Sequence, residues 1–307
     1  MIRFVLRRLA QSVIVVAAVV LLVFSLTFLS GDPATLLLAP DATREEVAAF
    51  RTAMGFDQPL WQQFLHFAGN LLAGDFGRSW RFQEPALPLV LERLPATLEL
   101  AFAAILLSLV IALPVGVISA VRRDTKIDGL SMIGALLGQS VPGFWLGLML
   151  ILIFAVNLGW LPTSGRNGLQ YLILPALSLG VTLAGRNARL VRSCMLEVLN
   201  EDYIRTARAK GIAEWRVVGK HALKNALLPI MTVVGLEFGT LLGGTIITET
   251  VFSWPGIGLL AVQAISGRDY PVVQAVIIIG SLSFVLINLA IDLLYTVLDP
   301  RVSLVRR

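Results

Sequence analysis

Six long apolar runs constrain the fold of this chain more than any other feature of its sequence. Each approaches or meets the roughly 20 residues that a helix needs to cross a hydrocarbon layer about 30 Å thick. They cover residues 9–30, 100–121, 130–158, 169–185, 227–248 and 272–291. With 56% hydrophobic and only 15% charged residues, most of the chain is suited to lipid rather than to water. The runs lack the alternating pattern of barrel strands, so the sequence predicts an all-α integral membrane protein with six transmembrane helices.

The basic residues predict how these spans are oriented. An even number of spans places both termini on one side of the membrane, together with the loops 122–129 and 186–226. These four segments hold 18 of the 25 Lys and Arg residues. Because cytoplasmic loops are enriched in Lys and Arg, both termini and both loops are predicted to be cytoplasmic. This topology explains the net charge of +5 without nucleic-acid binding, and the first run is too long for a cleaved signal peptide.

The polar stretch after the first run predicts a small extracytoplasmic helical cap. Thr43 and Glu46 have the spacing of a capping box, and apolar residues then recur at helical intervals through 47–54 and 60–72. Two short amphipathic helices are therefore expected. The predicted regions are residues 1–30 for the N-terminus and first helix, 31–98 for the cap, 99–298 for a five-helix core and 299–307 for a cytoplasmic tail.

Prolines and glycines inside the runs predict bends and close helix packing. Each of three prolines removes a backbone hydrogen bond and predicts either a static kink or a hinge that lines a path; they are Pro114, Pro142 and Pro175. In the fifth run, three glycines recur at intervals of four, namely Gly235, Gly239 and Gly243. Such a face lets helices approach closely, so it is expected to pack either against another subunit or within one bundle.

One acid inside the spans is a functional candidate. Glu237 lies about ten residues into the fifth run, and an ionised carboxylate near the bilayer centre costs roughly 2.5–3.5 kcal/mol on insertion scales. It should therefore face the bundle interior or a watery cavity. A place on a translocation path and a structural pairing role both remain open. Glu249, just beyond the same run, is the second candidate for the path.

The stretch EDYIRTARAKGIAEWRVVGKHALKNALLP, residues 201–229, is the most informative segment of the chain. Helix-forming residues up to Lys210 are interrupted by Gly211 and resume to about Leu227, and the second helix is expected to end as the chain meets Pro229. The pattern predicts a short helix, a glycine turn and a second helix that together form a rigid projection.

Several catalytic and binding motifs are absent from the sequence. GALLGQS at 134–140 lacks the lysine and the spacing of a phosphate-binding loop, and no nucleophile elbow or zinc-protease helix is present. Cys194 is the only cysteine and His66 and His221 are the only histidines, which excludes a structural zinc spacing and a disulfide framework. The sequence predicts no catalytic residues, no metal site and no cofactor bound by this chain.

Segments along nearly the whole chain resemble one family of permeases. The stretch 201–229 looks like the cytoplasmic coupling loop of ATP-binding-cassette (ABC) importers, specifically of their dipeptide, oligopeptide and nickel branch. The same branch is resembled by RFVLRRL at 3–9, GDPA at 31–34, FDQPLWQQF at 56–64, GDFGRSW at 74–80, LPATLELA at 94–101, ETVFSWPGIG at 249–258, RDYP at 268–271 and NLAIDLLYTVLDPR at 288–301. Two departures from the broader permease consensus, Arg205 in place of glutamate and the distance from Gly211 to Pro229, are shared by this branch.

The resemblance implies that the short helix before the glycine docks into a groove on an ATPase subunit. The implied docking segment consists of Tyr203, Arg205, Thr206, Ala207, Ala209, Lys210 and Gly211. The small side chains of Ala207 and Ala209 would permit close approach, and the basic side chains would pair with acids on the partner.

The resemblance also implies partners, location and cargo. It implies the permease subunit of an ATP-driven importer in the plasma (inner) membrane of a prokaryote, with a second homologous permease and two cassette ATPase subunits that use ATP and Mg. An extracytoplasmic binding protein would dock on residues 31–98 and 251–271. The expected cargo is a di- or oligopeptide, with a nickel chelate, glutathione or an opine as alternatives. A secondary transporter is the alternative of a different class, but the sequence shows no convincing internal repeat.

Overall fold

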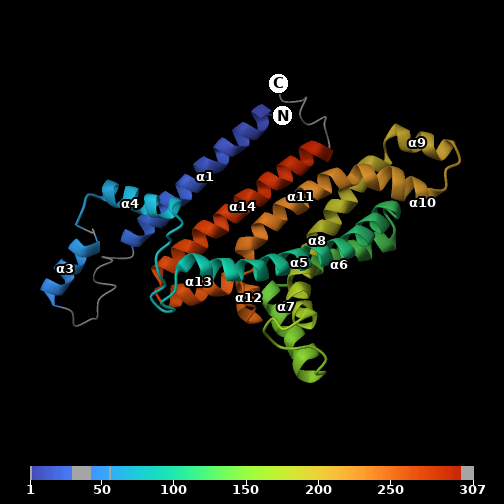
Figure 1. The fold of residues 1–307 in the computed structure, drawn as a ribbon. Coiled ribbons are helices and arrows are strands. Elements are labelled where there is room, and N and C mark those ends of the chain that lie inside the picture. The colour runs from blue at the N-terminus through green and yellow to red at the C-terminus, as the bar shows by residue number, and fades with distance from the viewer. Residues whose placement is uncertain (1, 30–42, 55–56, 299–307) are drawn as a thin grey trace. The chain divides into compact units, whose positions relative to one another are not determined.

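The computed structural model describes residues 2–29, 43–54 and 57–298, and most of these residues are helical (Figure 1). The only β pairing in this part of the chain is an isolated bridge between Arg78 and Pro85. The predicted all-α fold class is confirmed. The GDPA segment at 31–34 and the tail at 299–307 lie outside the described residues.

The helical elements follow one another with short connections, and η denotes a π-helical segment. They are α1 (Ile2–Leu29), α3 (Arg44–Met54), α4 (Leu60–Leu72), α5 (Ala86–Val121), α6 (Lys126–Ser140), α7 (Gly143–Leu150), η1 (Ile151–Asn157), α8 (Leu169–Leu199), α9 (Asp202–Ala209), α10 (Glu214–Arg216), η2 (Val217–Ala222), α11 (Leu223–Gly244), α12 (Ile246–Val251), α13 (Ile257–Ser266) and α14 (Tyr270–Leu298). Because α5 begins at Ala86, the range predicted for the cap already contains the start of a long apolar helix.

Five helices in the described residues are long and apolar enough to cross a membrane, and a sixth span is formed if α6 and the α7–η1 helix count as one. These two helices are bent by 93° relative to each other. The predicted third span is therefore not a single helix. Pro142 has no N–H to donate and adopts φ −60° and ψ 130° just before α7, so it ends one helix and starts the next.

The other prolines in the spans are accommodated inside helices. Pro114 lies within α5 and Pro175 within α8, as predicted, and Pro95 also lies within α5. Pro229 lies within α11, so the prediction that the helix after Gly211 ends before Pro229 is wrong. The α10–η2–α11 segment is helical from Glu214 to Gly244, because surrounding helices in a membrane bundle can compensate for one missing hydrogen bond.

The chain divides into two compact units, and unit 1 consists of residues 1–93 and 260–285. In this unit α1 packs on α4, where the ring of Phe24 lies 5.4 Å from that of Phe64 and 5.8 Å from that of Phe67. The two short helices predicted for the cap are α3 and α4. The capping box is also confirmed, since the Thr43 N–H donates to Glu46 Oε2 (2.8 Å) and the Glu46 N–H donates to Thr43 Oγ1 (3.3 Å).

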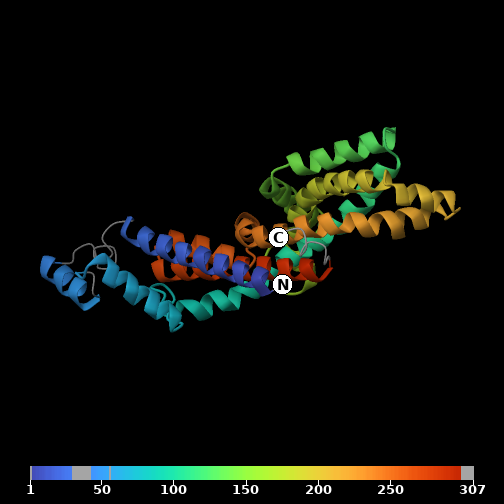
Figure 2. The same cartoon turned by 90° about the horizontal axis from the view of Figure 1, so that it is seen from above.

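Unit 2 consists of residues 94–259 and 286–307 and is built around α8. This helix packs against α6, α7, α11 and α12, and Figure 2 shows α6, α8 and α11 side by side. Glycines permit the close approach. A Cβ on Gly116 of α5 would lie 2.6 Å from Val191 Cβ of α8, and a Cβ on Gly180 would lie 2.8 Å from Leu107 Cδ2.

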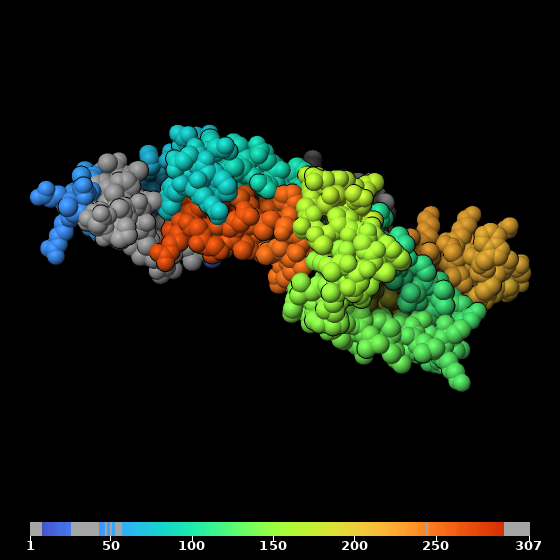
Figure 3. Space-filling view, turned by 90° about the horizontal axis from the view of Figure 1, so that it is seen from below, coloured from blue at the N-terminus to red at the C-terminus, as the bar shows by residue number. Residues whose placement is uncertain are grey.

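The α9–α10 hairpin, residues 201–216, projects from one end of unit 2 (Figure 3, gold). The turn between α5 and α6 lies at the same end, since a single pocket is lined by Arg122 and Ile127 together with Glu214 and Trp215. This agrees with the prediction that the two basic loops share one side.

Candidate functional site

The glycine turn of the α9–α10 hairpin is a Schellman motif, a common way to end a helix. The Gly211 N–H donates to the Arg208 carbonyl (2.9 Å) and the Ile212 N–H donates to the Ala207 carbonyl (3.3 Å). Gly211 has a φ of +73°, where a residue with a side chain is disfavoured by roughly 1–2 kcal/mol. The predicted glycine turn is therefore confirmed, and the motif explains why glycine is needed there.

The inner face of α9 anchors the hairpin to the core of unit 2. Ile204 and Ala207 are buried in the same cluster as Val217, as expected for residues three apart on one helix face. Ala207 therefore faces its own chain. This differs from the expectation that Ala207 permits the approach of a partner, because an eight-residue helix needs its only apolar stripe for its own packing.

The outer face of α9 is exposed and held in one orientation. Its exposed residues from the predicted docking segment are Tyr203, Arg205, Thr206, Ala209 and Lys210, followed by Gly211. Asn225 Nδ2 donates to the Tyr203 hydroxyl (2.8 Å). Arg208 makes a two-pronged contact with Glu214 across the turn, with distances of 3.1 and 2.7 Å. These bonds keep the hairpin rigid while leaving its outer face open.

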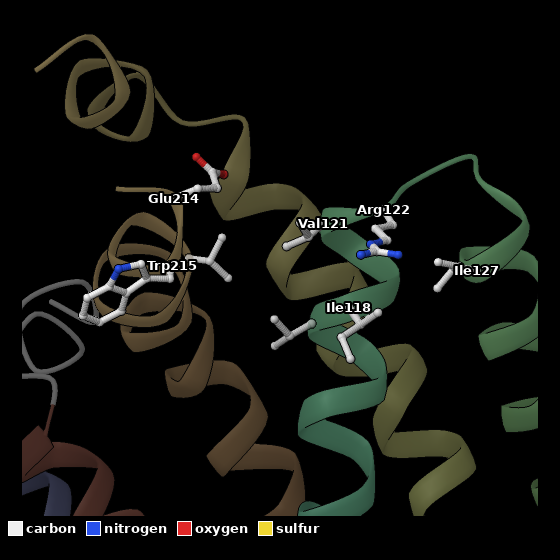
Figure 4. Close-up of a pocket in the computed structure, with 8 residues that line it drawn as sticks. Ile118, Val121, Arg122, Ile127, Glu214 and Trp215 are labelled. Atoms are coloured by element: carbon white, nitrogen blue, oxygen red, sulfur yellow. The ribbon is translucent and has the colours of Figure 1, made fainter. Parts of the chain in front are cut away.

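A pocket of about 450 Å³ lies between the hairpin and the end of α5 (Figure 4). Its walls are mainly aliphatic and it is lined by Val117, Ile118, Val121, Arg122, Ile127, Glu214, Trp215 and Val218. Trp215 is exposed, and the Arg216 guanidinium lies 4.9 Å from the centre of its ring. The pocket thus places the second arm of the hairpin beside the α5–α6 turn.

Glu237 lies on α11 and is buried against α8. Its Oε2 accepts a hydrogen bond from Asn187 Nδ2 (2.9 Å), and the same amide nitrogen lies 3.0 Å from Ser108 Oγ. Arg186 Nη2 lies 2.9 Å from Glu237 Oε1. The side chain of Glu237 is 7% exposed whereas that of Arg186 is 52% exposed. The predicted interior position of Glu237 is confirmed, and the structure adds its partners.

A second ion pair joins α8 to the start of α6. Arg192 donates from Nε and Nη2 to the two oxygens of Asp128, each at 2.7 Å. Asp128 also accepts from the Ser119 hydroxyl and from the Asp124 N–H (3.0 Å). Both oxygens of this buried carboxylate are hydrogen-bonded.

Glu249 is fully buried and holds the start of α13. Its carboxylate accepts hydrogen bonds from the Thr97 hydroxyl (2.7 Å), the Thr245 hydroxyl (2.9 Å) and the Leu259 N–H (2.9 Å). A Cβ on Gly258 would lie 2.9 Å from Glu249 Oε2, so this glycine leaves room for the carboxylate. The negative charge lies at the positive end of the helix dipole. The geometry favours this structural role over the path predicted for Glu249.

The three glycines of the fifth run do not share one environment. A Cβ on Gly235 would lie 2.8 Å from Ile291 of α14, so this glycine permits packing within the chain. Gly239 is buried, whereas Gly243 is exposed with open space around it. Packing within one bundle therefore accounts for Gly235, and of the three only Gly243 presents an open surface.

In unit 1, Asp269 organises the exposed turn that follows GDFGRSW. Its carboxylate is buried and accepts from the Ser79 hydroxyl, the Trp80 N–H and the Arg81 N–H. Gln83 and Arg268 have positive φ values of 57° and 52°. Backbone conformations of this kind persist where surrounding bonds hold them.

Sequence reasoning missed Arg186, Asn187, Asp128 and Arg192. The fourth apolar run was ended at its first charged residue, yet α8 continues to Leu199. Continuing the helical pattern past residue 185 would have placed Arg186 and Asn187 on the same helix as the span. Within the described part of the chain, no group of three or more His, Cys, Asp or Glu residues could hold a metal ion.

Comparison with known proteins identifies the family. Residues 112–304 match the family model described as binding-protein-dependent transport system inner membrane component, and residues 1–101 match the model for the N-terminal part of such components. The glutathione transport system permease protein GsiC of Escherichia coli (strain K12) is 44% identical over 303 residues, which cover 98% of this chain and 99% of the relative. The corresponding protein of Salmonella typhimurium (strain LT2) has the same identity and coverage.

Solved structures agree in fold. An inward-facing structure of the MetNI methionine ABC transporter matches with a TM-score of 0.60 at 24% identity, covering 69% of this chain and 96% of that one. An amino acid ABC transporter matches with a TM-score of 0.51 at 17% identity, covering 70% and 94%. The family matches cover nearly all of the sequence and agree with the resemblance found in its motifs. The chain therefore belongs to the family of binding-protein-dependent transport system inner membrane components and is a permease subunit of an ABC importer.

Proposed function

We propose that this chain forms half of the path by which an ABC importer moves short peptides of the glutathione class across the inner membrane. The observation that carries the proposal is the 44% identity, across 98% of the chain, to permeases of glutathione transport systems. Glutathione is itself a tripeptide, so this cargo lies within the peptide class that the motifs indicate. A nickel chelate or an opine is the alternative cargo on the same machinery.

The α9–α10 hairpin is the proposed contact with the ATPase. Its exposed residues Tyr203, Arg205, Thr206, Ala209 and Lys210 would meet a groove of the motor subunit on the cytoplasmic side. Ile204 and Ala207 are packed in the core of unit 2, and the helix after the turn continues into α11. Movement of the hairpin would therefore reach the helix that carries Glu237.

The complete importer is proposed to contain a second homologous permease, two ATPase subunits that hydrolyse ATP with Mg, and an extracytoplasmic binding protein. The binding protein would dock on the side of unit 1 that presents Trp80, Arg81 and Phe82. The turn of these residues is held by Asp269, and the Arg81 guanidinium lies 5.7 Å from the Phe82 ring centre. Closure of the motor would then drive alternating access of the path.

The cargo is tested by reconstituting the importer in proteoliposomes with its ATPases and binding protein. Uptake of tritiated glutathione and of alanyl-alanine is measured with and without ATP. ATP-dependent uptake of glutathione is expected. Uptake that proceeds without ATP and follows an ion gradient would instead indicate a secondary transporter, and uptake of neither peptide would overturn the proposed cargo.

The coupling role is tested at the glycine turn. Gly211→Val places a branched side chain at a φ of +73°, so we expect ATP-driven uptake to fall at least about tenfold while the spans remain folded. Gly219→Ala in η2 is the matched control, because a Cβ there meets nothing within 4 Å. Equal uptake by wild type and Gly211→Val would remove the support for coupling through this turn.

A further inference from the structure

The buried contact of α8 with α11 contains polar atoms that the protein leaves unsatisfied. Asn187 is fully buried, and its amide nitrogen donates both to Glu237 and to Ser108. Its oxygen, Oδ1, has no hydrogen-bond partner. Glu237 Oε1 lies within ion-pair distance of Arg186, but the contact lacks the angles of a hydrogen bond, so Oε1 has no hydrogen-bond partner either.

Two unsatisfied acceptors are unusual for a contact that serves only the fold. A buried polar atom without a partner costs about 1–3 kcal/mol, and charged residues inside membrane segments commonly mark pathways for solutes. The same helix shows what a saturated ion pair looks like in this chain, since Asp128 accepts from Arg192, Ser119 and Asp124. The Glu237 contact therefore has spare acceptors for an incoming group.

The three side chains complement a zwitterion. Glu237 Oε1 and Asn187 Oδ1 are acceptors suited to the three N–H donors of an ammonium group. Arg186 is half exposed and carries a planar guanidinium that can bind a carboxylate through two parallel hydrogen bonds. Arg186 Nη2 and Glu237 Oε1 are only 2.9 Å apart, so the matching ligand carries its positive and negative charges on one carbon.

We propose that Arg186, Asn187 and Glu237 form a binding site for an amino-acid head group, with ammonium and carboxylate on the same carbon, as cargo crosses the membrane. The ligand would insert between Arg186 and Glu237 and satisfy the two free acceptors. Glutathione carries such a head group at its γ-glutamyl end, whereas in an ordinary dipeptide the two charges are separated by the peptide bond. This site rests on the proposed function and deepens it.

The test removes both charges together in the reconstituted importer. A single change such as Arg186→Gln leaves a buried carboxylate without its partner, but Arg186→Gln with Glu237→Gln leaves no unpaired charge and is expected to preserve folding. For the double variant we expect a melting temperature within a few degrees of wild type and an uptake of tritiated glutathione, per assembled complex, that is about tenfold or more lower. The dependence of uptake on the concentration of loaded binding protein should keep its half-saturation point, because docking occurs elsewhere.

A matched control neutralises the saturated pair on the same helix. Asp128→Asn with Arg192→Gln is expected to lower the melting temperature while leaving uptake per assembled complex unchanged. Should the first double variant fail to assemble, Arg186→Lys keeps the charge but removes the planar fork, and the same loss of uptake is expected from it.

The outcomes separate the binding site from the function on which it rests. Wild-type uptake of glutathione that is equally fast in the double variant, or in assembled Arg186→Lys where only that variant assembles, would overturn the binding site and leave the proposed function intact. Absence of uptake of both glutathione and alanyl-alanine by wild type would overturn the proposed function, and the site with it.

Discussion

Two ion pairs anchored on α8 differ in how completely they are satisfied. Arg192 meets Asp128 through two bonds of 2.7 Å, and Asp128 accepts further bonds from Ser119 and Asp124. Arg186 meets Glu237 through a single contact of 2.9 Å without hydrogen-bond geometry. The side chain of Arg192 is 25% exposed, against 52% for Arg186.

This difference separates a contact built for stability from one that can accept a ligand. A carboxylate taken out of water is stabilised only when its lone pairs are all used, and Asp128 meets that condition. Glu237 retains an unused acceptor beside the unused oxygen of Asn187. The fold thus keeps its saturated pair where α5, α6 and α8 meet and its unsaturated pair where α8 meets α11.

The largest expected effect is on the saturated pair. Arg192→Gln leaves Asp128 buried without its charged partner, which typically costs about 3 kcal/mol or more. Thermal unfolding of the purified complex in detergent should report this loss. Arg189→Gln, on the exposed side of the same helix, is the control and should change stability by less than about 1 kcal/mol. Similar melting for the two variants would break the comparison.

Glu249 extends the comparison to a saturated carboxylate without a basic partner among the described residues. Glu249→Gln places an amide N–H₂ among the donors of Thr97, Thr245 and Leu259, so we expect a loss of about 2 kcal/mol. The measurement is again thermal unfolding of the complex. Glu99→Gln is the control, because Glu99 is an exposed partner of Arg166 and such pairs contribute at most about 1 kcal/mol. An effect at Glu249 no larger than at Glu99 would contradict the capping role.

The unsaturated pair should contribute less to stability. Arg186→Gln removes a half-exposed cation while Asn187 still donates to Glu237, so we expect a loss of about 1 kcal/mol. Measured beside Arg192→Gln, this variant sharpens the contrast between the two pairs. A loss as large as that of Arg192→Gln would mean that both pairs serve mainly the fold.

The smallest expected effect concerns an exposed carboxylate whose bonds are all local. The hydrogen bond from the Thr43 N–H, and then that from its hydroxyl, lower the pKa of Glu46 below its ordinary value of 4.5. A lowered pKa means that the contribution to stability is present above the unfolded value and is lost as pH falls through the folded one. Hydrogen exchange of the first amides of α3 should therefore accelerate below about pH 4. Glu45→Gln serves as the control, and unchanged exchange in Glu46→Gln at neutral pH would contradict the capping box.

The local features of the chain were predictable because their causes are local. The apolar runs, the Thr43–Glu46 capping box and the Gly211 turn each depend on residues a few positions apart. The break at Pro142 was predicted only as a bend within one span, because a proline in sequence does not reveal whether neighbouring helices will compensate. Pro229 shows the opposite error, since its helix continues.

The sequence by itself determined the helical class, the spans and the docking hairpin, because lipid burial and helix propensity act along neighbouring residues. Only the tertiary structure decided which face of α9 is buried, and hence that Ala207 faces its own core. It also decided the partners of Asp128, Glu237 and Glu249, which lie 64, 50 and 152 residues away in Arg192, Asn187 and Thr97. Such pairings depend on how helices pack in space, and the spacing of residues along the chain contains no record of that packing.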